Sequence, residues 1–204
     1  APQALAALEA GLHVYSAVPV IMLPDGDETL DWCDRLIQAS LRTGRHYMLG
    51  ETTYYHPEAM FCRRQAAAGN FGDFIYAEGE YFHDLDTFGG SNLREVKRRR
   101  ETGAIGSQWP DLKAKYLSRG LREGPMFYPT HSVSGPVCVM KASALKVTAR
   151  GYRNRTNDPY FADHEFSNEV ALFTMSNGAT VRICEFRECA GSFHDNETFR
   201  IMGT

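Results

Sequence analysis

Residues 45–85 read RHYMLGETTYYHPEAMFCRRQAAAGNFGDFIYAEGEYFHDL, and this stretch decides the fold class. Its first part, 45–51, is short and mostly apolar, as expected of a buried strand. Residues 56–70 have the pattern of a helix, and residues 71–85 alternate in the way that a long strand requires. The character of the sequence changes after the first of these strands, so we predict a domain boundary directly after Glu51.

The residues before this boundary alternate between helix and strand. Residues 3–10 predict a short helix, and residues 13–20, HVYSAVPV, predict a buried parallel strand. Asp25 or Asp27 can then cap the N-terminus of a second helix. Helix, strand, helix and strand with short connections are typical of a doubly wound parallel sheet. Residues 1–51 are therefore predicted to be the C-terminal part of a Rossmann domain. The second helix is expected to carry one apolar face, made of Leu30, Cys33, Leu36, Ile37 and Leu41.

The rest of the chain, residues 52–204, predicts an α+β domain that is truncated at its C-terminus. Residues 86–124 have weak periodicity and indicate loops and short helices. The elements expected after them are a helix over 131–143, a strand over 145–153, a hairpin over 169–186 with its turn at Asn177 and Gly178, and a last strand starting at Phe199. Together they predict a mixed, mostly antiparallel open sheet with helices on one face. Because the other face must meet something apolar, we expect a homo-oligomer formed through it.

Composition excludes several classes of partner. The 22 Lys and Arg against 25 Asp and Glu give a net charge of -3, which argues against binding to nucleic acid. No apolar stretch is long enough to cross a bilayer. The five cysteines are scattered singly, which predicts a reducing cytoplasmic compartment and no metal site. The basic cluster 97–100 is either a phosphate contact or a solvated helix end.

Two groups of side chains could carry chemistry. One is Tyr81, His83 and Asp84 at the end of the long strand, and the other is the Tyr128 to His131 segment before a helix. Tyr and His exchange protons and also offer an apolar face to a sugar ring. Each group alone is equally compatible with ordinary packing. His131 is the stronger candidate, because it lies at a loop-to-helix junction where Thr130 can cap the helix. The chain has no glycine-rich phosphate loop, P-loop, HExxH or GxSxG motif.

Taken together, these segments resemble the Gfo/Idh/MocA family, which includes glucose-fructose oxidoreductase and inositol dehydrogenase. Residues 7–20, ALEAGLHVYSAVPV, resemble the helix and strand that end in the Glu-Lys-Pro triplet of the family. Residues 46–81 are similar to its last Rossmann strand, crossover helix and first sheet strand. Residues 130–137, THSVSGPV, resemble its active-site helix, and residues 176–183, SNGATVRI, its returning hairpin.

The resemblance implies NAD or NADP as cofactor and a small carbohydrate-like substrate. It also implies that the glycine-rich part of the Rossmann domain precedes residue 1, so the chain alone is expected to be inactive and to bind the cofactor poorly. The implied cofactor-binding positions are Ala17, Val18, Pro19 and Thr52.

Two positions depart from the family pattern. Val18 stands where the family has its lysine, and Phe127 stands where it has an aspartate, so only His131 remains of the proton-relay set. The branch of NAD-dependent α-N-acetylgalactosaminidase-like glycoside hydrolases is similar at these points. It also has Val before the Pro, a YxHDL segment as in 81–85 and a YPTH segment as in 128–131.

In that branch NAD transiently oxidises the sugar so that the glycosidic oxygen leaves by elimination. One position weakens this match, because Thr52 stands where the branch has an asparagine near the nicotinamide. The resemblance implies catalytic roles for His131, Tyr128 and Tyr81. The implied substrate-binding residues are Tyr81, His83, Tyr128, Thr130 and His131.

Three functional hypotheses follow. The first is an NAD(P)-dependent oxidoreductase that acts on a sugar, inositol or related polyol. The second is a glycoside hydrolase that uses NAD catalytically. The third is a family member that has lost its lysine and acts as an oligomeric binding module without catalysis.

Overall fold

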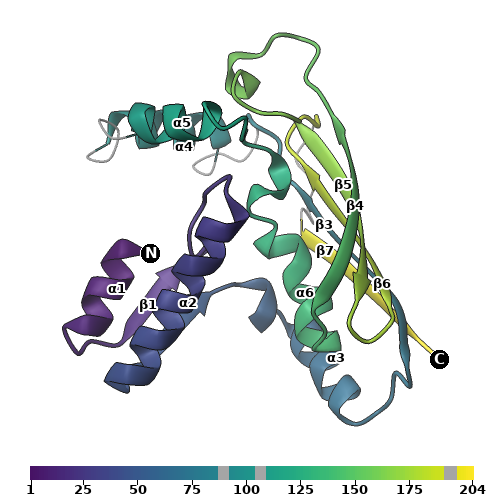
Figure 1. The fold of residues 1–204 in the computed structure, drawn as a ribbon. Helices are drawn as coiled ribbons and strands as arrows, with labels where there is room; N and C mark the ends of the chain where they lie inside the picture. Colours follow the sequence, from purple (N-terminus) through teal and green to yellow (C-terminus); the bar gives the residue numbers. More distant parts are fainter. Residues whose placement is uncertain (87–91, 104–108, 191–196) are drawn as a thin grey trace. The chain divides into compact units, whose positions relative to one another are not determined.

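The protein, seen as a computed structural model in Figure 1, folds into two compact units, Ala1–Thr52 and Thr53–Thr204. The structure describes residues 1–86, 92–103, 109–190 and 197–204.

The first unit is a parallel strand pair with two helices. The pair is formed by residues 14–17 and 47–50, with Val14 opposite Tyr47, as expected for neighbouring strands of a parallel sheet. Leu8, Leu36 and Ala39 form its buried core. In chain order, the elements of this unit are α1 (Pro2–Glu9), β1 (Val14–Ala17), α2 (Gly26–Thr43) and β2 (Tyr47–Gly50).

Helix α2 has the N-cap that the sequence allowed. Asp25 is the N-cap, since its carboxylate accepts hydrogen bonds from the backbone N–H groups of Asp27 and Glu28. At 100° per residue the five predicted apolar residues fall within one arc of about 140°. Within this face Leu36 is buried, whereas Leu30 and Ile37 are 69% and 56% exposed.

The second unit is built on a five-stranded sheet of order β4-β5-β6-β3-β7. β3 and β6 are parallel, and every other neighbouring pair is antiparallel. The predicted mixed, mostly antiparallel open sheet is therefore confirmed. The strands are β3 (Phe74–Phe82), β4 (Ala144–Tyr152), β5 (Asn168–Met175), β6 (Thr180–Phe186) and β7 (Glu197–Gly203). The helices are η1 (Thr53–Tyr55), α3 (Pro57–Ala67), α4 (Leu93–Thr102), α5 (Trp109–Leu117), η3 (Pro125–Phe127), α6 (Thr130–Met140) and η4 (Pro159–Phe161).

Helix α6 packs directly on one face of this sheet, and α3 packs against α6 (Figure 1). Two glycines allow the close approach. A Cβ atom on Gly79 of β3 would lie 1.8 Å from the carbonyl oxygen of Ser132, and one on Gly135 would lie 2.5 Å from the ring of Phe199. Pro136 contributes too, because it has no N–H to donate to the Ser132 carbonyl. The backbone of the sheet and the backbone of the first turns of α6 are therefore in direct contact.

The hairpin between β5 and β6 confirms the turn predicted from the sequence. Gly178 has φ +86°, in the left-handed region that glycine tolerates, and its N–H donates to the carbonyl of Met175. The weakly periodic middle of the chain contains the short helices α4 and α5, as predicted. Parts of it, residues 87–91 and 104–108, lie outside the described residues, as do residues 191–196.

The basic cluster 97–100 lies on α4 and has a structural role at one position. Lys97 is half-buried and donates to the backbone carbonyl of Tyr160 at 2.9 Å. Arg94, one turn earlier, donates to both carboxylate oxygens of Asp158 at 2.8 and 2.6 Å. These contacts support η4, so the solvated-end interpretation holds only for the exposed middle of the cluster.

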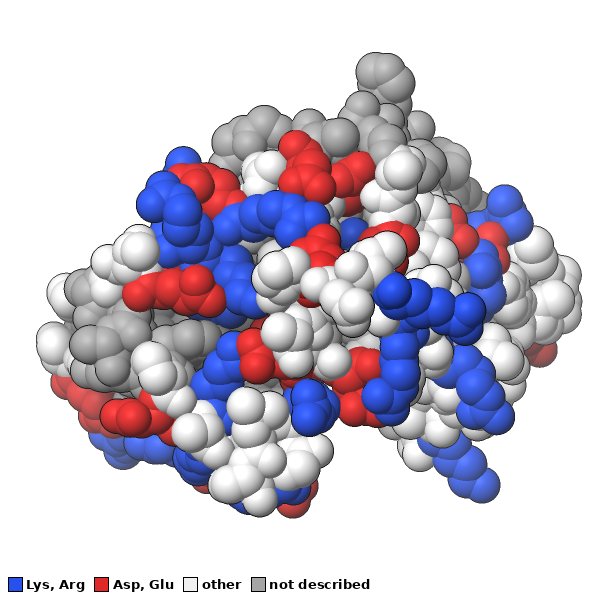
Figure 2. Space-filling model, turned by 90° about the horizontal axis from the view of Figure 1, so that it is seen from above, with Lys and Arg blue, Asp and Glu red and all other residues white. Residues whose placement is uncertain are grey.

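The surface has charges of both signs, and the cysteines are unpaired, as the composition indicated. Figure 2 shows positive and negative side chains interspersed on the face it presents. All five cysteines are free thiols. Among the residues that the structure describes, no helix combines the length and the apolar character that a bilayer span needs.

Candidate active site

The site is built where the two parallel strands of the second unit end. Tyr81 is the penultimate residue of β3 and pairs in register with Glu185 of β6. His83 follows β3, and its backbone N–H donates to the carbonyl of Phe186 at 2.9 Å. The side chains of Tyr81 and His83 are buried, with 6% and 7% exposed. The parallel pairing of β3 and β6 therefore brings polar groups from two distant parts of the chain to one sheet edge.

Tyr128 and His131 reach the same region from the segment before α6. Tyr128 follows η3, and His131 is the second residue of α6. The predicted cap by Thr130 was wrong. The helix begins one residue earlier than expected, with Pro129 as N-cap, and the Pro129 carbonyl accepts from the N–H of Val133. The Thr130 hydroxyl is buried and has no hydrogen-bond partner among the described residues.

The rings of these residues converge. The centroids of Tyr81 and His131 are 4.9 Å apart, and the Tyr81 hydroxyl lies 2.5 Å from Nδ1 of His83. On its other side, Nδ1 of His131 lies 3.4 Å from a carboxylate oxygen of Glu197 at the start of β7. The Thr53 hydroxyl donates to the second oxygen of Glu197 at 2.7 Å. Two phenols and two imidazoles thus share one half-buried region, where they can hold or pass protons.

A buried ion pair underlies this region, and the sequence analysis did not find it. Glu185 and Arg187 are 0% and 3% exposed, and an Nη atom of Arg187 donates to Glu185 at 2.7 Å. The guanidinium carbon lies 4.9 Å from the ring centroid of Tyr81 and 5.4 Å from that of Tyr128. Glu185 and Arg187 continue the alternate positions of the apolar Val181 and Ile183, and charged residues in such a series are the signal that was available in the sequence.

Burial sets the electrostatics of Tyr81 and Glu185. Desolvation raises the pKa of Tyr81 well above its usual value, and the positive charge of Arg187 opposes that rise. Burial likewise raises the pKa of Glu185, against the effects of Arg187 and of the hydroxyl of Ser132, which donates to the carboxylate. The site therefore favours the neutral phenol at neutral pH, and a proton leaves Tyr81 only with help from its neighbours.

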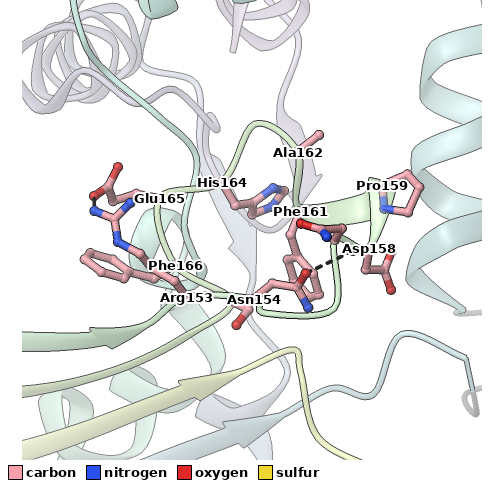
Figure 3. A pocket seen from close by; sticks show the side chains of 11 residues that line it. Arg153, Asn154, Asp158, Pro159, Phe161, Ala162, His164, Glu165 and Phe166 are labelled. Atoms are coloured by element: carbon pink, nitrogen blue, oxygen red, sulfur yellow. Dashed lines mark hydrogen bonds and ion pairs between the residues drawn. The ribbon is translucent and has the colours of Figure 1, made fainter.

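Two cavities of about 340 Å³ each lie in the second unit. One is formed by the loop 153–167, and Figure 3 shows Arg153 and Glu165 together on one side of it and Asp158 on the other. The other is lined by Arg187 and by residues after β3. Neither is lined by the three predicted catalytic residues, so we locate the site from the convergence of the rings and not from these cavities.

The predicted cofactor positions lie in the first unit. Ala17 ends β1 and is in register with Gly50 of β2, so Val18 and Pro19 leave the sheet at the same edge as Thr52. The Val18–Pro19 peptide is cis. Carboxyl ends of parallel strands are where dinucleotides bind in this type of sheet.

The first unit fits one end of a dinucleotide only. Its α2 N-terminus carries the Asp25 cap and acidic residues in the first turn, an arrangement that repels a diphosphate, and the sequence contains no glycine-rich loop. The residues of the first unit therefore do not fit the diphosphate of a dinucleotide, and the nicotinamide positions Ala17, Val18, Pro19 and Thr52 stay a prediction.

Comparison with known proteins finds sequence similarity to one group of glycoside hydrolases. The chain is 32% identical over 138 residues to "Glycosyl hydrolase family 109 protein 2" of Bacteroides fragilis and to an alpha-N-acetylgalactosaminidase of the same species. It is 27% identical to an alpha-N-acetylgalactosaminidase of Shewanella oneidensis. The matched segment is 67% of this chain but only 28% of the Bacteroides proteins. No family model matches the chain.

Solved structures share the fold of the whole chain. Scyllo-inositol dehydrogenase of Lactobacillus casei, solved with NAD(H) and scyllo-inositol, matches 100% of this chain and 51% of its own, with a TM-score of 0.70 and 16% identity. Myo-inositol 2-dehydrogenase of Lactobacillus plantarum gives a TM-score of 0.68 at 16% identity over the same shares. Aldose-aldose oxidoreductase of Caulobacter crescentus gives 0.67 at 16% identity and covers 99% of this chain and 50% of its own. The chain therefore belongs to the Gfo/Idh/MocA family.

Proposed function

We propose that the chain is part of an NAD(P)-dependent oxidoreductase that acts on a sugar, inositol or related polyol. The observation that carries the proposal is that Tyr81 and Tyr128 lie beside one buried guanidinium and that the His131 ring lies 4.9 Å from the Tyr81 ring. Tyrosine and histidine rings can bind a sugar through its apolar face and exchange protons with its hydroxyls. The inositol and aldose enzymes that share the fold support this substrate class.

His131 is the proposed acid and base. Glu197 lies on the Nδ1 side of its ring, which favours a proton on Nδ1 and makes Nε2 the basic nitrogen. The substrate hydroxyl would lose its proton to His131 while the carbon that bears it loses a hydride. A nicotinamide bound beside Ala17, Val18, Pro19 and Thr52 would supply the hydride acceptor.

The remaining site residues would bind and orient the substrate. Tyr81 and Tyr128 flank the proposed substrate position, and Tyr81 can pass a proton to His83 across the 2.5 Å contact between them. His83 is buried behind Tyr81, so its proposed contact with substrate is indirect. The Thr130 hydroxyl has no partner in the described residues and remains a proposed substrate contact.

A second candidate function is an NAD-dependent glycoside hydrolase. The sequence similarity to α-N-acetylgalactosaminidases favours it, as does Val18, which cannot move a proton as the lysine of the family can. In this case His131 and the tyrosines would share the proton transfers of an elimination and of the addition of water, with no net change in the cofactor.

One experiment separates these functions. Full-length protein would be incubated with NAD and free sugars or inositols, and separately with p-nitrophenyl glycosides. Stoichiometric NADH supports the oxidoreductase, whereas release of p-nitrophenol without net NADH supports the hydrolase. Neither product over a broad panel of both compound classes would contradict both enzymatic functions and leave the binding module.

We also propose the domain roles and the assembly. Residues 1–51 would belong to the dinucleotide-binding domain and residues 52–204 to a domain for substrate binding and oligomerisation. The sheet face turned away from α6 carries Tyr152, Leu172 and Met202, each more than 40% exposed, together with the ion pairs of Arg182 with Glu78 and Glu80. The exposed apolar side chains support a homo-oligomer through this face. The five free thiols support a cytoplasmic location.

A further inference from the structure

The side of β6 that faces the core changes from apolar to charged residues at the C-terminal end of the strand. Val181 and Ile183 are apolar and buried, but the next residues on the same side are Glu185 and Arg187. Placing two charges in the interior costs several kcal/mol per ion before their attraction is counted. A salt bridge at such a position adds little net stability compared with apolar side chains. The pair therefore calls for an explanation other than fold stability.

The contacts of the pair indicate what it does. Glu185 is held on both oxygens, by Ser132 of α6 on one and by Arg187 on the other. Arg187 also donates to the backbone carbonyl of Phe186 at 3.1 Å. Since the guanidinium is planar and fixed by these hydrogen bonds, its position beside the rings of Tyr81 and Tyr128 is fixed as well.

We propose that Arg187, held in place by Glu185, is a positioning residue that orients Tyr81 and Tyr128 and stabilises negative charge on their hydroxyls during proton transfer. The proposal rests on the proposed function of this site. It adds to that function an electrostatic role for Arg187, whose guanidinium lies beside the tyrosine rings and does not touch substrate.

The charges around Tyr81 support this role. Among the described groups that act on Tyr81, the negative charges of Glu185 and Glu197 and the phenol of Tyr128 all disfavour a phenolate, and Arg187 favours it. His83 and His131 contact the same phenol from β3 and α6. A buried phenolate without a nearby cation would be strongly disfavoured, because the low dielectric of the interior magnifies an uncompensated charge.

The test uses full-length protein with its cofactor and the substrate identified by the assay above. Arg187→Met should lower kcat about tenfold to a hundredfold with a smaller change in KM, and should move the basic limb of the pH profile to higher pH. Arg187→Lys keeps the charge and should restore the position of that limb in part. Arg182→Met is the matched control, because Arg182 lies on β6, the strand that ends just before Arg187, and pairs with Glu78 and Glu80 on the opposite sheet face. This variant should leave the profile unchanged.

A double-mutant cycle separates positioning from a structural role. In a background with both Tyr81→Phe and Tyr128→Phe, Arg187→Met should cost much less than in the wild type, because the hydroxyls on which the cation acts are already absent. Additive effects would overturn the proposal. If Arg187→Met fails to fold, the double variant Glu185→Met with Arg187→Met removes both charges together and should fold, since apolar replacement of a buried pair is tolerated.

A measurement that needs no enzymatic turnover can test the proposal even if the proposed function is wrong. The protein would be labelled with tyrosine carrying ¹³C at Cζ, and the Tyr81 signal would be assigned by its loss in Tyr81→Phe. Arg187→Lys should shift this signal less than Arg187→Met does. An identical Tyr81 signal in the wild type and in Arg187→Met would overturn the proposal, whereas a shifted signal in a protein without turnover would contradict the proposed function alone.

Discussion

His131 is the residue on which the proposed chemistry depends most, because Val18 and Phe127 cannot transfer a proton. We predict that His131→Ala lowers kcat by about a hundredfold, the usual contribution of a general acid or base. Steady-state kinetics on the full-length protein would measure the change. His56→Ala is the control, since His56 is exposed and makes no side-chain cap on α3. Equal turnover in both variants would rule out His131 as the acid and base.

His164 gives a prediction about stability. Burial, together with the nearby charge of Lys97, lowers its pKa to about 4, so the folded protein holds it neutral while the unfolded chain protonates it near its ordinary pKa. The unfolded state then binds more protons between these values, and stability is lost as the pH falls.

We expect the free energy of unfolding to decrease by roughly 3 kcal/mol between about pH 6.5 and pH 4 on account of His164. Urea unfolding of the wild type and of His164→Phe across this range would measure it. The variant should lose less stability than the wild type as the pH falls, and His56→Phe should behave like the wild type. Parallel curves for the wild type and His164→Phe would contradict a buried neutral imidazole.

At the scale of elements, the approach of α6 to β3 places His131 beside Tyr81. Gly79 makes this approach possible, because any side chain there would meet the Ser132 backbone. We predict that Gly79→Ala destabilises the fold by about 3 kcal/mol, at the upper end for overpacking, because the clash is with backbone atoms. Thermal unfolding measures the change. Gly26→Ala is the control, since nothing lies within 4 Å of its Cβ position and helix α2 gains propensity.

At the scale of the molecule, the uncovered sheet face should join copies of the protein. Leu172 is 48% exposed in the middle of β5, opposite Arg182 of β6. We predict that Leu172→Lys weakens self-association by roughly a hundredfold or more, because the contact would bury a second cation beside Arg182, whose partners Glu78 and Glu80 are already engaged. Sedimentation of the full-length protein would measure it. Val96→Lys on α4 should sediment as the wild type does, and a wild type that is monomeric at micromolar concentration would contradict the assembly.

Local sequence patterns predicted most of the elements correctly. Alternation identified β3, and Asn177 with Gly178 identified the hairpin of β5 and β6, because these features depend on residues close together in the chain. The exposure of most of the apolar face of α2 could not be predicted for a related reason. Periodicity shows that a helix has apolar residues but does not show which of them another element covers.

The sequence by itself determined the family, the order of the elements and the identity of the candidate residues Tyr81, Tyr128 and His131. Only the tertiary structure decided that the rings of Tyr81 and His131 meet, and that Tyr81 and Tyr128 lie beside the buried Arg187 and its partner Glu185. The reason is physical. Contact between β3, β6 and α6 depends on strand register and on the space left by Gly79, and these are set by packing between segments that are distant in the sequence.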